Sequence, residues 1–158
     1  MFSDQVTVSL RRLSMNERNE SEAPRLLPTF PIALQRKFRE TMSAIQRGHW
    51  DVVLQTIHFN PELLTAQSSV SGGQTLLHIA LSQNIFLPEK VVVNMLKLCP
   101  RIIYATDANH CHALHYAASN GQHVDLIPLF LERWKDGASK ANMDGNSPLH
   151  LAAFHGRR

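Results

Sequence analysis

Apolar residues recur every three to four positions along several stretches of the chain, the spacing of a helix that buries one face. Three stretches show the pattern most clearly: Val52, Val53 and Ile57; Val91, Val92, Met95 and Leu96; and Leu126, Ile127, Phe130 and Leu131. Other segments combine leucine with paired small residues such as Ala117-Ala118 and Ala152-Ala153, which let one helix approach another closely. The pattern predicts an all-α fold built from short helices.

Three of the small-residue segments are copies of one another. They read GQTLLHIALSQN (residues 73–84), HCHALHYAASNG (110–121) and GNSPLHLAAFHG (145–156), and their shared Leu-His pairs lie 37 and 35 residues apart. A fourth, degraded copy precedes them, because residues 44–49 parallel residues 117–122. One helix pair of this kind cannot bury its apolar face alone, so we expect several units to stack along one axis.

The last copy carries a family signature. Its sequence Ser-Pro-Leu-His-Leu-Ala-Ala (residues 147–153) resembles the Thr-Pro-Leu-His-x-Ala-Ala signature of ankyrin repeats, and the resemblance covers roughly residues 38–158. It implies a solenoid of stacked helix-turn-helix units with projecting finger loops, and a concave protein-binding face made of fingertips and first helices. It also implies that the signature histidines His78, His115 and His150 tie each helix start to its finger by hydrogen bonds.

On this interpretation residues 35–158 form an array of about three and a half repeats, and residues 1–34 form a flexible or disordered tail. The array is truncated, since the last unit stops after its first helix and leaves apolar residues such as Leu149 and Phe154 without a covering helix. We expect the chain to be a fragment of a longer array, the alternative being that a partner or a second copy covers this end.

Four local features predict details of the structure, and the last three depart from a regular repeat. Ser147 is expected to cap a helix whose first turn holds Pro148. The turn over residues 83–88 lacks its glycine, so a bulged connection should restart the helix at its final proline. His110 replaces the glycine of a finger turn and should adopt a positive φ. Pro128 is compatible with the next helix only if that helix starts late, with Asp125 as its cap.

The charge of the chain argues against nucleic acid as its ligand. The formal net charge is +3, but residues 49–158 hold eight Lys and Arg against eight Asp and Glu, so the excess lies within residues 1–48. Nucleic-acid binding draws on clustered cations, and the body of the chain shows no such stripe. No run of eighteen apolar residues and no secretory signal is apparent, so we expect no membrane insertion and a cytoplasmic location, with the nucleus also open to the protein.

The histidines and cysteines do not predict a metal site or an active site. His110, Cys111, His112 and Cys99 are zinc-type ligands, but their spacing is wrong for four converging ligands. Cys111 beside a histidine is the one candidate nucleophile, and the chain lacks a phosphate loop, a nucleophile elbow or a metalloprotease helix. We therefore expect thiols, no cofactor, no metal, no small-molecule ligand and no enzymatic activity.

The resemblance places the partner-contacting positions at the fingertips and at the exposed ends of the first helices. They are Gln46, Arg47, Ser71, Gly72, Gln74, Ser82, Gln83, Ala108, Asn109, Cys111, Ser119, Asn120, Met143, Asp144, Asn146, Phe154 and His155. Most are uncharged polar residues, a composition suited to hydrogen-bonded recognition of a protein. The alternative is that many of them simply face water. On the first hypothesis, changing Asn109, Ser119 and Asn120 together abolishes binding without lowering stability.

Three classes of function follow. The leading hypothesis is a non-catalytic adaptor or scaffold that binds a protein partner on the concave face. The second is a signalling regulator resembling inhibitors of the kappa-B type, with Ser14 in an Arg-Arg-Leu-Ser sequence as a phosphorylation switch. The paired-serine degradation motif of that family is absent. The third is the targeting segment of a longer enzyme.

Overall fold

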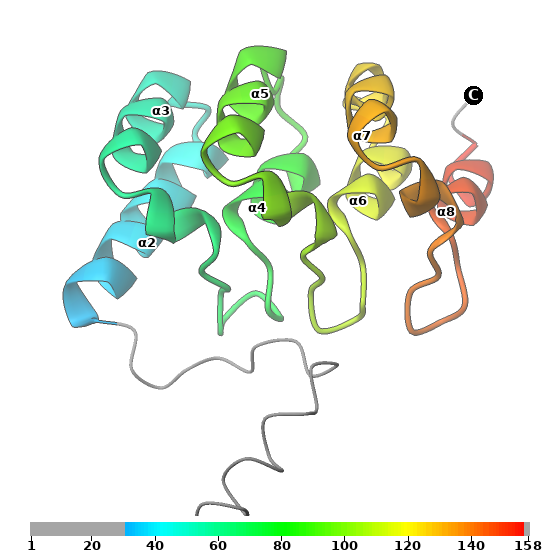
Figure 1. The fold of residues 1–158 in the computed structure, drawn as a ribbon, viewed down its shortest axis with the longest axis horizontal. Helices are drawn as coiled ribbons and strands as arrows, with labels where there is room; N and C mark the ends of the chain where they lie inside the picture. Colours follow the sequence, from blue (N-terminus) through cyan, green and yellow to red (C-terminus); the bar gives the residue numbers. More distant parts are fainter. Residues whose placement is uncertain (1–30, 157–158) are drawn as a thin grey trace, which may run out of the picture.

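The computed structural model describes residues 31–156, which fold into a row of helix pairs (Figure 1). The seven α-helices of this part are α2 (Ile32–Gln46), α3 (Trp50–Phe59), α4 (Leu76–Ser82), α5 (Glu89–Leu98), α6 (Ala113–Ser119), α7 (Ile127–Arg133) and α8 (Pro148–Phe154). Four short 3₁₀ helices follow or precede them: η2 (Pro61–Leu64), η3 (Pro100–Tyr104), η4 (Val124–Leu126) and η5 (Lys135–Ser139). The predicted all-α fold of stacked units is confirmed.

The helices form two rows. An inner row runs α2, α4, α6, α8, with each helix contacting the next, and an outer row of α3, α5 and α7 lies above it in the view of Figure 1. Loops between the pairs project at the lower edge of the view in Figure 1, where the resemblance placed the fingers. No helix of the part described is long and apolar enough to cross a bilayer.

The first helix starts earlier than the sequence suggested. α2 begins at Ile32 with Pro31 before it, so residues 32–34 belong to the helix and not to the predicted tail, whose boundary at residue 34 is therefore too late. Proline fits this place because a helix start does not need its missing N–H. The remainder of the predicted tail, including Ser14, lies outside the described residues.

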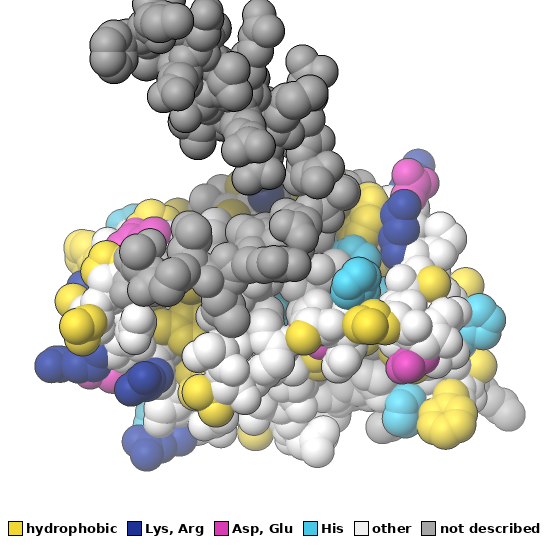
Figure 2. Space-filling model, turned by 90° about the horizontal axis from the view of Figure 1, so that it is seen from below, with side chains coloured by type: hydrophobic (Ala, Val, Ile, Leu, Met, Phe, Trp, Pro, Cys, Tyr) yellow, Lys and Arg dark blue, Asp and Glu magenta, His cyan; other side chains and the backbone are white. Residues whose placement is uncertain are grey.

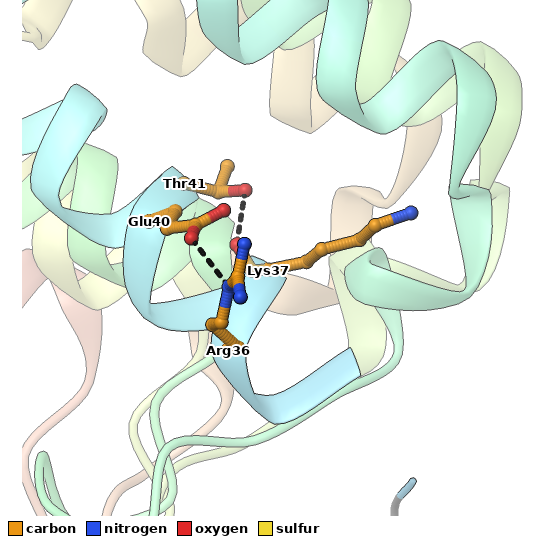
Figure 3. A network of polar contacts seen from close by, with 4 residues as sticks. All are labelled: Arg36, Lys37, Glu40 and Thr41. Carbon is orange, nitrogen blue, oxygen red and sulfur yellow. Dashed lines mark hydrogen bonds and ion pairs between the residues drawn. The ribbon is translucent and has the colours of Figure 1, made fainter. Parts of the chain in front are cut away.

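Short-range contacts shape α2 (Figure 3). The Arg36 guanidinium forms an ion pair with Glu40 one turn later, at 2.9 Å. The buried Thr41 hydroxyl donates to the Lys37 carbonyl oxygen at 2.7 Å, which satisfies a polar group that would otherwise be costly to bury. The Lys37 side chain points away from Arg36 and donates to Asn60 Oδ1 at 2.6 Å, connecting α2 to the start of η2.

The core lies between the two rows and between successive units. Leu77 of α4, Ile57 of α3 and Leu64 of η2 are fully buried, as are Val91 and Met95 of α5. Removing a side chain of this size from water contributes about 1.5–3 kcal/mol. Burial of the periodic apolar side chains of the outer helices therefore contributes much of the free energy that holds adjacent units together.

The repeated Leu-His pair has different exposure at the two ends of the row. Leu77 and Leu114 are buried, while Leu149 at the same place in α8 is 69% exposed. His78 and His115 are also buried, whereas His150 is exposed. The leucine and histidine of α4 and α6 are buried because the helix of the next unit packs against each of these helices.

The predicted local features are largely confirmed. Ser147 caps α8, with Pro148 at its first position, and His110 has φ 58°. α5 begins at Glu89 with Pro88 as its N-cap. α7 starts late and holds Pro128 in its first turn, but its N-cap is Leu126, so the expected cap by Asp125 is wrong. The reason is that residues 124–126 form the 3₁₀ turn η4, which takes up the position of Asp125.

Candidate functional site

Three fingers project from the row: residues 68–74, 106–112 and 142–146. An antiparallel bridge joins Ser68 to Gln74 in the first finger and Thr106 to His112 in the second. In the third, the Asn142 N–H donates to the Asn146 carbonyl oxygen at 2.9 Å. Each finger is thus a small hairpin closed at its base.

In each finger, one polar side chain accepts hydrogen bonds from backbone N–H groups of the turn. Asp107 Oδ1 accepts the N–H groups of Asn109 and Cys111, at 2.9 and 2.8 Å. Asn142 Oδ1 accepts two N–H groups in the same way, and Ser68 Oγ accepts one. These bonds satisfy backbone donors that a tight turn leaves unpaired, so the hairpins keep a defined shape without external partners.

Neighbouring fingers are also bonded to each other through their backbones. The Ala108 N–H donates to the Gly72 carbonyl oxygen at 2.8 Å, and the Met143 N–H donates to the Asn109 carbonyl oxygen at 2.9 Å. The close approach requires glycine at position 73, where φ is +76° and an added Cβ would lie 3.2 Å from the Ala108 nitrogen. The three fingertips therefore form one continuous row.

The signature histidines join the helix starts to the fingers. The Thr75 N–H donates to His78 Nδ1 at 3.2 Å, and the His112 N–H donates to His115 Nδ1 at 3.1 Å. Because Nδ1 accepts, the ring proton sits on Nε2, which in His115 faces the Asn146 carbonyl oxygen of the next finger at 3.2 Å. The expected histidine links are confirmed.

The surface formed by the fingers is mainly uncharged. Figure 2 looks at the molecule from the finger side, where white side chains and backbone dominate the part that grey atoms do not cover, and dark blue Lys and Arg groups lie toward the edges. The view agrees with the charge balance of residues 49–158, which is zero.

A family model described as ankyrin repeats (3 copies) matches residues 87–158. This part of the chain is similar to ankyrin repeats, which agrees with the family that the repeated signature suggested. No curated protein matches the chain. Ankyrin repeats generally mediate protein–protein interaction and are typically non-catalytic. The match begins at the end of the bulged turn, and the fold continues the same two-row architecture back through α2.

The ankyrin fold brings many of the predicted contact positions to the surface, and none of them is fully buried. The exposed ones are Gln46, Arg47, Gly72, Ser82, Ala108, Asn109, Met143, Asp144, Phe154 and His155. The half-buried ones are Ser71, Gln74, Gln83, Cys111, Ser119, Asn120 and Asn146. The fingertip members lie in one row through the backbone bonds described above, while the two pairs from α2 and α8 lie at opposite ends of the inner row.

Several of the half-buried positions make internal side-chain hydrogen bonds, and Gln74 is one of them. Gln74 Nε2 donates to the Tyr116 hydroxyl at 2.6 Å, and that hydroxyl donates to Asp107 Oδ2 at 2.7 Å. Burial and the bond to Asp107 raise the pKa of Tyr116 well above its usual range. The Gln74 amide of the first finger is therefore connected, through the Tyr116 hydroxyl, to Asp107 of the second finger.

Asn120 has a structural role that the sequence did not reveal. Its Nδ2 donates to the carbonyl oxygens of Leu81 and Gln83, at 3.0 and 2.8 Å. The buried His123 approaches the same Gln83 oxygen with Nε2 at 3.0 Å. The expectation that Asn120 can be replaced without loss of stability conflicts with these bonds, because the bulged turn offers carbonyl groups that need donors.

Two exposed apolar residues were missed by sequence reasoning. Val70 stands in the first finger directly before Ser71 and is 84% exposed. Phe86 lies in the bulged turn, is 77% exposed, and has its carbonyl oxygen held by Trp50 Nε1 at 3.0 Å. The available signal was a lone valine between two serines, and an aromatic residue in a turn too long for the repeat.

The cysteine and histidine cluster of the second finger does not form a reactive pair. Cys99 and Cys111 are free thiols, and the described part of the chain contains no group of three or more potential metal ligands. Burial raises the pKa of Cys111, which opposes formation of the thiolate. His112 stacks on His115 with ring centroids 5.6 Å apart and meets Trp134 at 4.8 Å, so this ring packs within the fold.

Proposed function

We propose that this chain is an adaptor or scaffold module that binds a protein partner across its fingertips and the exposed ends of its inner helices. The observation that supports this most directly is the bonding of each fingertip backbone to the next, through Gly72, Ala108, Asn109 and Met143. The backbone groups are used within the protein, so the side chains at the tips are left to face a ligand.

A row of this kind suits recognition by shape. Little conformational entropy is lost on binding when the backbone is already fixed, which is the advantage of a preorganised surface. Val70 and Met143 supply exposed apolar contact at the first and third tips, and Asn109 supplies a polar group between them. This mixture of apolar and uncharged polar groups fits a folded protein or a peptide.

The test compares three forms of the full chain as bait in an affinity capture read by mass spectrometry. The wild type is set against V70E/N109E, which puts two carboxylates on the fingertips. The matched control V52E/N94E makes the same substitutions on the outer helices, at exposed positions of α3 and α5. We expect at least one protein to be captured by the wild type and the control and to be reduced tenfold or more with V70E/N109E.

Two results would reject the proposal. One is that no protein distinguishes the wild type from the fingertip variant. The other is that the outer-helix control loses the same proteins, which would indicate a general effect of charge or folding. Circular dichroism should show equal helix content in all three forms, because every altered side chain is exposed or half-exposed.

The same proposal includes a cytoplasmic location with access to the nucleus. It is supported by the two unpaired thiols, which are usual in a reducing compartment. Imaging of the tagged full chain, with a secretory-pathway marker as the comparison, tests this part.

A further inference from the structure

The net charge of the protein equals the charge of one helix and its C-cap. Residues 31–47 contain four basic residues, Arg36, Lys37, Arg39 and Arg47, and one acidic residue, Glu40, a balance of +3. The formal net charge of the whole chain is also +3, so the other residues hold twelve basic and twelve acidic groups. α2 (Ile32–Gln46) together with its C-cap Arg47 therefore carries a charge equal to the whole excess.

Three of these cations lie on one side of α2. Arg36, Arg39 and Arg47 are spaced by three and eight residues, which places them along a single helix face at 3.6 residues per turn. Phe38, Thr41, Ala44 and Ile45 are buried on the opposite face. We call the three arginines the arginine stripe, and all of them are exposed.

Most of the charge on the stripe is uncompensated. Arg36 pairs with Glu40 at 2.9 Å, with both side chains largely in solvent, so this pair is readily exchanged for another carboxylate. Within residues 31–156, neither Arg39 nor Arg47 has a hydrogen bond or ion pair from its side chain. Figure 3 shows Lys37 extending away from Arg36, toward the side where it meets Asn60, so it stands apart from the stripe.

The stripe adjoins the candidate binding surface. It ends at Arg47, which with Gln46 forms the α2 contribution to that surface. From Arg36 to Arg47 the helix rises about 16 Å, at ~1.5 Å per residue. An extended peptide covers that length with about five residues.

We infer that the arginine stripe binds a carboxylate-rich segment of the protein partner, about five residues long, at the N-terminal end of the row. This inference rests on the proposed function and specifies the chemistry of the partner at one end. A guanidinium presents a planar fork of donors that matches a carboxylate, and arginine is favoured over lysine for such contacts. The neutral middle of the row then contributes shape and hydrogen bonding, while α2 contributes charge.

A protein segment fits this stripe better than a nucleic acid. Nucleic-acid sites combine many phosphate-contacting cations or stacking aromatic rings. The stripe has three cations, and its neighbours on the same side of α2 are the exposed Ile32, Glu40 and Gln46 and the half-buried Ser43. The arrangement favours a few directed carboxylate contacts.

The experiment titrates the ¹⁵N-labelled full chain with an acetylated, amidated hexaglutamate peptide and follows amide shifts by NMR at low ionic strength. The charge-free comparison is hexaglutamine. The test variant is R39E/R47E, and the matched control is R101E/R133E, which changes charge equally at exposed arginines of η3 and α7. R39Q/R47Q repeats the test without charge reversal, in case the first variant fails to fold.

We expect hexaglutamate to shift amides of α2 and its C-terminal turn, hexaglutamine to shift none, and added salt to weaken binding. The dissociation constant should rise at least tenfold in R39E/R47E or R39Q/R47Q and stay within about twofold in R101E/R133E. Binding that is absent, or lost equally in both charge variants, overturns the inference. Tighter binding of α2 to a single-stranded oligonucleotide or to phosphatidylserine vesicles than to hexaglutamate also overturns it.

These outcomes are separate from those of the fingertip experiment. If V70E/N109E loses a partner and hexaglutamate does not bind α2, the binding function stands and only the acidic segment is rejected. If no partner depends on the fingertips, the proposed function fails, whatever α2 does with the peptide.

Discussion

Replacing Asn120 with alanine should destabilise the junction between the second and third repeats. The side chain gives two hydrogen bonds, to the carbonyl oxygens of Leu81 and Gln83, and its Oδ1 accepts the Gln122 N–H at 3.2 Å. A typical bond of this kind contributes about 0.5–1.5 kcal/mol net, and an acceptor left unsatisfied in a buried place costs about 1–3 kcal/mol. His123 still approaches Gln83, which limits the cost at that oxygen. We expect a loss of roughly 2–3 kcal/mol.

Urea unfolding measures this loss, followed by circular dichroism and by tryptophan fluorescence. The two tryptophans report from different repeats, because Trp50 begins α3 and Trp134 follows α7. Coincident transitions indicate that the row unfolds as one unit, which permits a single free energy of unfolding. Ser119→Ala is the matched control, since its hydroxyl makes one local bond to the Tyr116 carbonyl oxygen at 3.1 Å.

The control variant should lose about 0.5 kcal/mol or less. Asn120→Asp distinguishes the donor from the acceptor, because a carboxylate keeps Oδ1 but cannot donate to either carbonyl oxygen. It should therefore lose at least as much as Asn120→Ala. If Asn120→Ala stays within about 0.5 kcal/mol of the wild type, the bonds to the bulged turn do not stabilise the fold.

Three further predictions concern the fingers, the histidines and the repeated leucine. Gly73→Ala should lower the free energy of unfolding by about 1–3 kcal/mol in a urea titration, since φ is +76° and the added Cβ meets the next finger; an unchanged midpoint would contradict this. Burial lowers the pKa of both His78 and His112 to about 4, from 6.5. The unfolded chain therefore binds more protons between pH 6.5 and 4, so stability should be full above pH 6.5 and fall on acidification, by up to about 1.4 kcal/mol per pH unit for each histidine. Urea midpoints that stay level from pH 7.5 to 4.5 would refute this reasoning. Leu77→Ala should cost about 2–5 kcal/mol and Leu149→Ala below about 1 kcal/mol, because the first is fully buried and the second is 69% exposed; similar losses in thermal melts would show that burial does not set the cost.

The architecture could be predicted from the sequence because its determinants are local and repeated. The cap Ser147, the late start forced by Pro128 and the strained His110 each depend on a few neighbouring residues, so their consequences can be read without knowing the partners. Repetition adds a second check, since Leu77 and Leu114 occupy the same place in successive units and both are buried.

The surface was harder to predict because its residues depend on contacts distant in sequence. Asn120 reaches a carbonyl oxygen 37 positions away, and Gln74 reaches a hydroxyl 42 positions away. Both look like free polar groups in the sequence. The exposure of Val70 depends on how far the first finger projects, which a local pattern does not give.

These long-range bonds decide which substitutions can test binding. Gln83 and Asn120 stand at the same place in successive repeats, and the amide of the second holds the carbonyl oxygen of the first. A variant of Asn120 therefore changes the surface of two repeats and their stability together, so lost binding would not identify a contact. Val70 and Asn109 avoid this difficulty because their side chains make no hydrogen bond within residues 31–156. Loss of a partner in V70E/N109E, with unfolding unchanged, is the result that separates recognition from folding.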